Sequence, residues 1–255
     1  MISDQQLERY SRQILVPGID FAGQEAISSA RVLVVGCGGL GCPIALYLAG
    51  AGVQTLRLVD DDCVELSNLA RQIAFTEADI DQPKVGALQA RLQALNSEVT
   101  VDAYFARFTS DNAQQMLADI DLVIDASDSR GTRSLIDLST RERQIPWIMG
   151  AAVQMSGMWA AFSPGRSEGC YHCLMPDSVS GQPADCATLG ILGPVVAMVA
   201  SAQSALALKY LADPESIAWG RLSLLDMRSE EVQRLNLQRN PQCPYCGPVN
   251  GSSPQ

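Results

Sequence analysis

Several signatures of common enzyme and binding classes are missing from this 255-residue chain. No G-x-x-x-x-G-K-[ST] pattern occurs, which excludes a P-loop kinase or ATPase. The single histidine, His172, lies between two cysteines, and no arrangement for the proton transfers of hydride chemistry is evident. The 28 acidic side chains outnumber the 18 basic ones, giving a net charge of −10, and such a surface repels nucleic acid.

A secretory signal is also missing, because residues 1–6 carry no basic region followed by an apolar run. We therefore expect a cytoplasmic protein. The uncharged stretch 188–208 approaches the length of about 20 residues that spans a membrane. However, Gly190, Gly193 and Pro194 interrupt its start and three polar side chains interrupt the rest. We expect a buried helix over about 195–211, with Pro194 in its first turn, and no membrane partner.

Strand and helix patterns alternate through the first 150 residues. Strands are expected at 31–35, 55–59, 99–105, 121–126 and 147–150, and helices at 3–15, 41–49, 84–95 and 132–143. This alternation predicts an α/β fold with a Rossmann-like, mostly parallel sheet. Further strands at 158–162, 222–225 and 232–237 would extend the sheet, and a polar loop over 175–185 is long enough to be functional. Residues 248–255 are expected to form a flexible tail.

A glycine cluster directly follows the first strand and opens a helix. The sequence Gly-Cys-Gly-Gly-Leu-Gly at 36–41 allows a tight turn and close backbone approach at a helix N-terminus. Asp60 ends the next strand about 20 residues further on, where its carboxylate can accept bonds from ribose hydroxyls. This context predicts a nucleotide site, although a glycine turn that serves packing alone remains an alternative.

The nucleotide is a separate question, because this fingerprint usually indicates NAD. Polar and cationic residues nevertheless gather after the second strand, including Arg71 and Lys84, which could hold a triphosphate. Asp128, at the carboxyl end of a later strand, could hold Mg²⁺. The alternative for each of these charges is a solvated surface position, and for either cation taken alone that alternative is favoured.

Two C-x-x-C pairs, Cys170/Cys173 and Cys243/Cys246, predict a tetrahedral zinc site. A closed shell of four thiolates leaves no position for water, so the zinc should be structural and should pin the C-terminal part of the chain onto the body. A thioredoxin-like redox pair is the alternative, and it is weaker because two pairs occur. His172 lies inside the first pair and is interpreted as a bystander.

Together these motifs resemble those of the MoeB/ThiF/HesA family, bacterial relatives of the ubiquitin-activating enzymes. The matching pieces span residues 9–247 in the family's order: Arg-Tyr-Ser-Arg-Gln at 9–13, the glycine loop, Ser-Asn-Leu-Ala-Arg-Gln at 67–72, Gln-Pro-Lys at 82–84, Asp128 with Arg133, and both cysteine pairs. Within the family the chain looks closest to the molybdopterin-synthase adenylyltransferases, with the thiamine-pathway enzymes second.

The resemblance implies a homodimer that uses ATP to adenylate the C-terminal glycine of a small ubiquitin-like sulfur carrier ending in Gly-Gly. The carrier would be that of molybdopterin biosynthesis or, alternatively, of thiamine biosynthesis, with sulfur from a separate donor. It further implies one adenylation domain over 1–247, with a nucleotide-binding half at about 28–150 and a carrier- and zinc-binding half at about 151–247. An NAD-dependent oxidoreductase and a nucleotide-binding scaffold without catalysis are the competing hypotheses.

Residue roles follow from the same resemblance. Arg12 would reach into the partner's site, and Arg71, Lys84 and Asp128 would act on the phosphates and Mg²⁺. The nucleotide set comprises Gly36, Gly38, Gly39, Gly41, Asp60, Asp62, Asn68, Arg71, Gln72, Lys84, Asp128 and Ser129. Cys186 occupies the family's reactive-cysteine position, where a thiol could form a thioester with an acyl adenylate, or it is an incidental loop cysteine. Three residues depart from the pattern: Ser129 for Asn, Ala70 for Gln and Cys37 for Leu.

Overall fold

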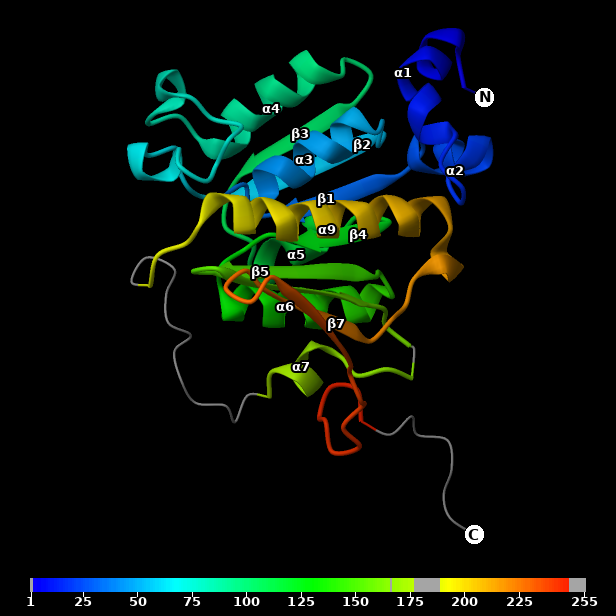
Figure 1. Ribbon diagram of the computed structural model, residues 1–255, viewed down its shortest axis with the longest axis vertical. Coiled ribbons are helices and arrows are strands. Elements are labelled where there is room, and N and C mark those ends of the chain that lie inside the picture. The colour runs from blue at the N-terminus through cyan, green and yellow to red at the C-terminus, as the bar shows by residue number, and fades with distance from the viewer. Residues whose placement is uncertain (1, 166, 177–188, 248–255) are drawn as a thin grey trace.

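The protein is described from a computed structural model, which covers residues 2–165, 167–176 and 189–247. Its centre is an eight-stranded sheet of order β3-β2-β1-β4-β5-β6-β7-β8 (Figure 1). The strands are β1 Arg31–Val35, β2 Thr55–Asp60, β3 Thr100–Phe105, β4 Leu122–Asp125, β5 Trp147–Val153, β6 Ser156–Phe162, β7 Arg221–Asp226 and β8 Glu231–Asn236. The pairs from β3 to β5 are parallel and those from β5 to β8 antiparallel, which confirms a Rossmann-like sheet extended by C-terminal strands.

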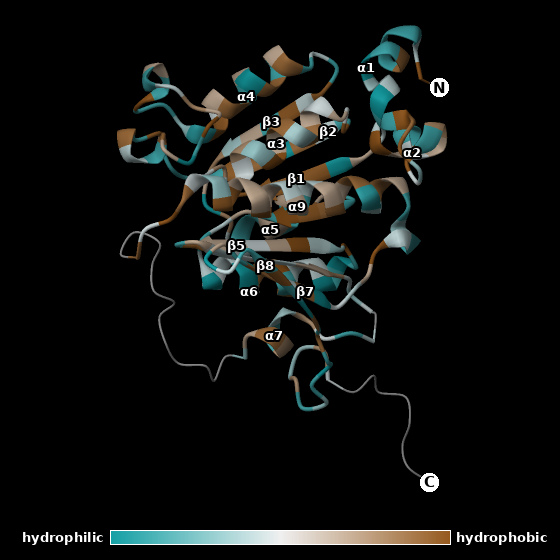
Figure 2. Ribbon diagram, in the orientation of Figure 1, coloured by the Kyte–Doolittle hydropathy of each residue, from teal (hydrophilic) through white to brown (hydrophobic). Residues whose placement is uncertain are grey.

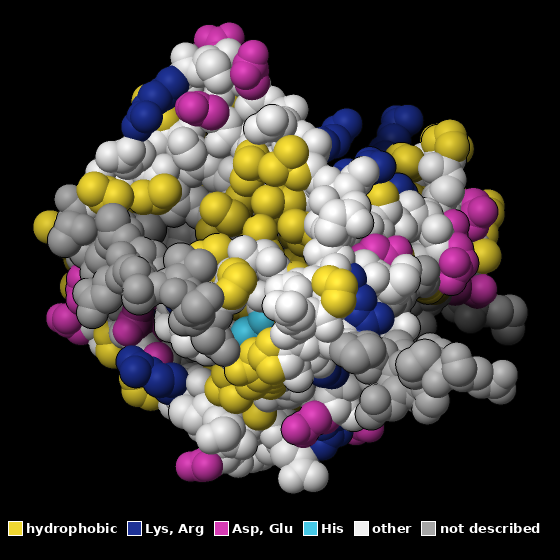
Figure 3. All heavy atoms as spheres, turned by 90° about the horizontal axis from the view of Figure 1, so that it is seen from below, with side chains coloured by type: hydrophobic (Ala, Val, Ile, Leu, Met, Phe, Trp, Pro, Cys, Tyr) yellow, Lys and Arg dark blue, Asp and Glu magenta, His cyan; other side chains and the backbone are white. Residues whose placement is uncertain are grey.

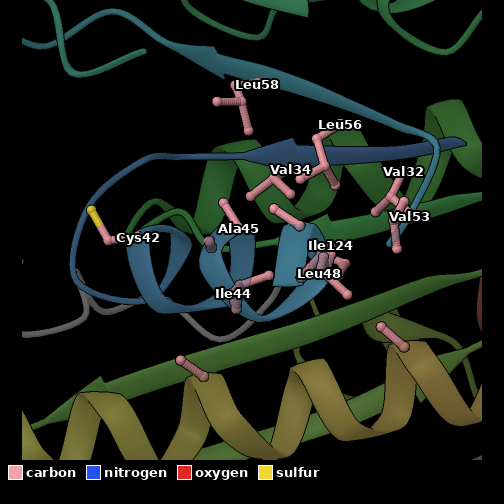
Figure 4. Packing of buried hydrophobic residues seen from close by; sticks show 14 of the residues in the cluster. Val32, Val34, Cys42, Ile44, Ala45, Leu48, Val53, Leu56, Leu58 and Ile124 are labelled. Atoms are coloured by element: carbon pink, nitrogen blue, oxygen red, sulfur yellow. The ribbon is translucent and has the colours of Figure 1, made fainter. Parts of the chain in front are cut away.

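Helices cover both faces of the parallel half. They are α1 Asp4–Ile14, α2 Asp20–Ile27, α3 Gly41–Gly50, α4 Lys84–Leu95, α5 Ser110–Met116, α6 Arg130–Arg143, α7 Tyr171–Leu174 and α9 Gly193–Ala212, with short turns η1 Leu66–Asn68, η2 Glu77–Asp79 and η3 Pro214–Ser216. One hydrophobic cluster joins β1 and β2 to α3, α4 and α9, and a second joins the other face to α5 and α6. Val32 and Val34 of β1 and Leu48 of α3 show the first cluster in Figure 4.

Alternating side chains of β1 explain the two clusters. Val32 and Val34 point to the face under α3, whereas Leu33 and Val35 join the opposite cluster, and all four are buried. A strand that is apolar on both faces is expected at the centre of a parallel sheet covered by helices. Figure 2 shows hydrophobic residues in the central strands and hydrophilic ones along α1.

The uncharged stretch forms α9, which is long and apolar enough to cross a membrane by length and composition. In the structure it lies along the sheet and packs against α2, α3, β5 and β6 (Figure 1). Val196, Val199 and Ala200 are buried in the larger core cluster. The interpretation as a buried core helix is therefore confirmed, and its proline lies in the first turn.

Candidate functional site

The glycine loop between β1 and α3 is packed tightly against the end of β4. Gly36 has a φ of +96°, and a Cβ there would lie 2.8 Å from the carbonyl oxygen of Ala126. A Cβ on Gly41 would collide with the carbonyl oxygen of Gly36. Only glycine fits either position, and the start of α3 has no side-chain cap. The loop therefore offers backbone N–H groups and a positive helix end to an anion.

Asp60, at the end of β2, is fixed against this loop. One carboxylate oxygen accepts the N–H of Cys37 at 2.6 Å and the other accepts the N–H of Asp62 at 2.8 Å. Burial raises the pKa of Asp60, and the two backbone hydrogen bonds only partly offset that effect. Its carboxylate thus lies at the carboxyl end of a parallel strand beside the glycine loop, the part of such sheets where ligands bind.

Lys84 brings a buried positive charge to the same place. Its Nζ lies 2.7 Å from a carboxylate oxygen of Asp62, and its side chain is 6% exposed against 64% for Asp62. The Lys84 N–H also donates to the Asp62 carbonyl oxygen, and a β-bridge joins Cys63 to Pro83. A desolvated ammonium with one exposed carboxylate partner is suited to exchange that partner for phosphate oxygens.

The segment after η1 lies against the glycine loop. A Cβ on Gly39 would lie 3.5 Å from Cγ of Arg71, and a Cβ on Gly38 would lie 3.5 Å from Nε2 of Gln72. Gln72 is 3% exposed, and its Oε1 has no hydrogen-bond partner among the residues that the structure describes. A buried carbonyl oxygen without a partner beside the glycine loop fits a site that is completed by a hydrogen-bond donor of a ligand. Arg71 donates to the carbonyl oxygen of Ser67 at 3.1 Å.

Asn68 braces this segment from inside. It is buried, and its side chain accepts the N–H of Glu65 and donates to the hydroxyl of Ser67. These bonds form a capping arrangement around the short turn η1. In the structure Asn68 therefore shapes the backbone that carries Arg71, a contribution separate from the phosphate-lining role that the resemblance implies.

The end of β4 carries Asp128 on a loop held by an ion pair that sequence reasoning missed. Arg133 of α6 donates from Nε to Asp125 at 2.9 Å and from Nη2 to the carbonyl oxygen of Ser127 at 2.7 Å. Asp125 is fully buried, and burial raises its pKa despite the attraction of Arg133. Asp128 itself is exposed, and Ser129 caps α6 by accepting the N–H of Thr132. The family motif had associated Arg133 with Asp128, and nothing in the sequence marked Asp125 as its partner.

Arg12 lies away from these residues within the same chain. It is exposed in the last turn of α1. That helix is anchored where α3 and α4 end, because Gln13 donates to the carbonyl oxygen of Ala51 and Asn96 donates to the hydroxyl of Tyr10. Those helix ends lie at the opposite edge of the sheet from Asp60. One chain alone thus does not bring Arg12 to the glycine loop.

The four paired cysteines converge. The Sγ atoms of Cys170 and Cys173 are 3.9 Å apart, those of Cys170 and Cys243 3.7 Å, and those of Cys173 and Cys246 3.3 Å. Tetrahedral zinc with Zn–S bonds of about 2.3 Å requires sulfur atoms about 3.8 Å apart, so the four donors fit this ion. Burial raises the pKa of Cys243, but backbone N–H groups of Cys246 and Tyr245 bond its sulfur and bring the pKa down to about 7.

His172, interpreted from the sequence as a bystander to the four sulfurs, has polar partners of its own on α6. Its Nδ1 lies 2.8 Å from a carboxylate oxygen of Asp137, and its Nε2 lies 2.7 Å from the hydroxyl of Ser134. The ring also stacks on Tyr245 with centroids 3.9 Å apart. Nothing in the sequence pattern around residue 172 indicates these partners, because both polar ones are on α6. Cys186, the other residue singled out near α7, lies outside the described residues.

Comparisons with known proteins agree with this architecture. The ThiF family model matches residues 10–245. The chain is 42% identical to the sulfur carrier protein ThiS adenylyltransferase of Escherichia coli, covering 98% of both chains. It is 38% identical to the molybdopterin-synthase adenylyltransferase of Salmonella typhimurium, covering 96% of this chain and 98% of the relative.

A solved structure extends the agreement to the fold. The crystal structure of E. coli MccB superposes with a TM-score of 0.82 at 20% identity, over 97% of this chain and 74% of that one. At this identity the likeness concerns the arrangement of strands and helices alone. The family model and the near-full-length relatives carry the assignment: this chain belongs to the ThiF family.

Proposed function

We propose that this protein adenylates the C-terminal glycine of a small ubiquitin-like sulfur carrier, releasing pyrophosphate from ATP. The observation that carries the proposal is the buried ammonium of Lys84, which lies beside Asp60 and the glycine loop in a chain of the ThiF family. Relatives named as adenylyltransferases of sulfur carriers cover nearly the whole chain. The activated carrier would then receive sulfur as a thiocarboxylate from a separate donor.

The chemistry is mainly positioning and charge. A C-terminal carboxylate has a pKa of about 3.5 and is ionised at neutral pH, so its attack on phosphorus needs no general base. The obstacle is repulsion between this carboxylate and the triphosphate. Lys84, Arg71 and the N-terminus of α3 are placed to reduce that repulsion and to stabilise charge on the departing pyrophosphate. Asp60 would fix the ribose, and Asp62 would hold Lys84 until phosphate replaces it.

Two metals accompany this proposal. Mg²⁺, held by Asp128 next to the Asp125–Arg133 pair, would neutralise phosphate charge. Zn²⁺, held by the four cysteines, would be structural, because a complete thiolate shell leaves no position for substrate. The nucleotide-binding half over 28–150 and the carrier- and zinc-binding half over 151–247 would form a single domain acting as a cytoplasmic homodimer. Cys186 is proposed as a nucleophile downstream of adenylation.

The carrier is proposed to be that of molybdopterin biosynthesis, and the thiamine-pathway carrier is the second candidate. The second candidate is favoured by the 42% identity to a ThiS adenylyltransferase, against 38% and 36% for two molybdopterin-synthase relatives. In the space-filling view of Figure 3, hydrophobic side chains gather in the middle of one face and charged ones toward its rim. Such a surface suits the docking of a small protein.

The decisive experiment mixes the purified protein with ATP, Mg²⁺ and each carrier, and measures AMP, pyrophosphate and carrier mass. We expect a carrier mass increase of one adenylate, dependent on an intact Gly-Gly terminus. ATP binding without turnover with any carrier would leave only a nucleotide-binding scaffold. Preferential binding of NAD with reduction of a small substrate would favour the oxidoreductase hypothesis instead.

A further inference from the structure

The imidazole of His172 bonds to two residues on the same helix. It is 4% exposed, and its two nitrogens lie 2.8 Å from Asp137 and 2.7 Å from Ser134. Positions 134 and 137 are three residues apart on α6 and so share one face of that helix. Because both ring nitrogens are engaged, the imidazole fixes the α7 segment to α6 in both position and orientation. The proposed reaction makes no use of these contacts.

The same ring belongs to both halves of the cysteine cluster. His172 stands between Cys170 and Cys173, and its face packs on Tyr245, which stands between Cys243 and Cys246. The two pairs are far apart in the sequence, and a zinc ion would join them through metal–sulfur bonds. The stack on Tyr245 therefore depends on the two pairs being held together, which is what the metal would do.

From α6 the contacts continue to the nucleotide loop. Arg133, the residue before Ser134, bonds both Asp125 and the carbonyl oxygen of Ser127. Tyr171, the residue before His172, lies close enough to Arg133 for the guanidinium charge to act on its hydroxyl. The glycine loop packs on the carbonyl oxygen of Ala126 in this same segment. A continuous path of packed and hydrogen-bonded groups thus runs from the cysteine cluster to the loop that carries Asp128.

The buried surroundings of Asp137 indicate that the contacts of His172 serve to position α6. The second carboxylate oxygen of Asp137 accepts the indole N–H of Trp147 at 3.3 Å, and Arg141 lies 3.6 Å from the oxygen that His172 uses. Asp137 is 3% exposed. A buried carboxylate with this many partners holds a fixed geometry, and losing one partner leaves buried charge uncompensated. The Ser–His–Asp order occurs in hydrolases, but a ring this deeply buried favours holding α6 in place.

We propose that His172 is a positioning residue that couples zinc occupancy of the four-cysteine site to the order of α6. With zinc bound, the imidazole holds Ser134 and Asp137 and keeps α6 against the end of β4. Without zinc, Tyr245 and the second cysteine pair leave the ring, and α6 loses that support. The coupling rests on the proposed zinc site; its importance for catalysis rests on the proposed function.

Hydrogen exchange in a two-by-two cycle tests the coupling. The wild type and His172→Ala are each measured with zinc bound and after chelation, reading the amides of residues 134–140. We expect chelation to speed exchange in the wild type by about tenfold, whereas zinc-loaded His172→Ala already exchanges at the faster rate and responds less than about twofold. Zinc content should stay at one ion per chain in both, because the four sulfurs are unchanged.

Variants separate coupling from simple stabilisation. His172→Asn can keep a donor toward Asp137 and should restore part of the zinc response. Glu142→Ala, an exposed position on the same helix, should behave as the wild type. Equal responses to chelation in the wild type and His172→Ala, or no response in the wild type, would overturn the inference. If the chelated protein unfolds, the comparison is made between the zinc-loaded wild type and zinc-loaded His172→Ala. Unchanged amide exchange in α6 would then overturn the inference, and faster exchange confined to α6 would support it.

This readout does not depend on turnover. A zinc-dependent α6 in a protein that never adenylates a carrier would leave the coupling standing and remove the proposed function. Conversely, carrier adenylation with an α6 that ignores zinc would remove the coupling alone.

Discussion

Individual buried charges set the character of the nucleotide site. Asp60 and Asp125 end β2 and β4, the two strands that flank β1, and each is held by hydrogen bonds despite burial that raises its pKa. Lys84 and Arg133 are the cations of the site that form ion pairs with these acidic segments. Both are largely buried, with side chains that are 6% and 13% exposed. Charges kept from water act strongly on a bound phosphate, because little solvent screens them.

Replacing Lys84 tests whether its buried charge acts on the phosphates. We expect Lys84→Ala to lower carrier-dependent exchange of labelled pyrophosphate into ATP by about 10²-fold or more, as removal of a preorganised charge-stabilising donor does elsewhere. Arg91→Ala is the matched control, since Arg91 is an exposed cation on the same helix paired with Asp79. The role assigned to Lys84 is wrong if both variants exchange at the wild-type rate.

Asp60 predicts a pH dependence of nucleotide binding. Its pKa is raised above 3.8 by burial, so its carboxylate takes up a proton at a higher pH than an exposed aspartate. ATP affinity should fall as pH decreases through that raised pKa, because a protonated carboxyl accepts ribose hydrogen bonds poorly. The folded state binds this proton more tightly than the unfolded state, so Asp60 itself adds stability as pH falls through this range.

Isothermal titration at stepped pH checks the effect, with Asp60→Asn as the comparison. The variant should bind ATP more weakly at neutral pH and should lack the acid-dependent loss. A wild type and variant with parallel pH profiles would assign the dependence to another group.

At the scale of elements, α6 links the end of β4 to the segment that carries the first cysteine pair. Its first turn follows Asp128, its middle holds Arg133 and Ser134, and Asp137 reaches the cysteine cluster. Helix ends are sensitive to their caps because the first N–H groups have no partner within the helix. The departure from the family pattern at Ser129 therefore falls on a structurally defined position.

Ser129 should be replaceable by the family's usual residue. Asparagine caps helices as well as serine does, so Ser129→Asn should leave both the unfolding midpoint in urea and the adenylation rate near wild type. Ser129→Ala should lose about 1 kcal/mol of unfolding free energy, since the bond to the N–H of Thr132 is lost. Ser139→Ala, within the same helix, provides the control. A fully stable Ser129→Ala would show that the cap contributes nothing.

Much of the fold was predictable because periodicity and glycine chemistry are local. Every predicted strand and helix is present with ends shifted by a few residues, including α9. Within the described residues, the short α-helices α2, α5 and α7 were missed. The helix α5 had a readable start, a capping box between Thr109 and Asn112, but it is too short to show a period. Short connections join β5 to β6 and β7 to β8, whereas the pairing of β6 with β7 depends on long-range packing that no local pattern encodes.

The candidate site was predictable in part for the same reason. Asp60, Arg71, Gln72 and Lys84 gather at the glycine loop, where strand ends and motif order placed them. The Asp125–Arg133 pair and the partners of His172 were invisible, because they join side chains from elements that meet only after folding. The sequence singled out His172 only because it lies inside a C-x-x-C pair, and that position does not identify partners on another helix.

At the scale of the whole molecule, the position of Arg12 argues for a shared site. Arg12 is exposed on a helix anchored at the far edge of the sheet from Asp60, so a proposed role at the phosphates requires a second copy.

Arg12→Ala and Lys84→Ala should each be inactive alone. After mixing and exchange of subunits, half the dimers would be hybrid, each with one site that combines an intact Lys84 and an intact Arg12. Adenylation should return to about a quarter of wild type. Lys84→Ala mixed with Asp60→Ala is the control, because both residues would come from the same chain at each site. One site of each hybrid then lacks Lys84 and the other lacks Asp60, so no activity should return. Activity that never returns in the first mixture, with subunit exchange verified by mass, would place Arg12 outside the site.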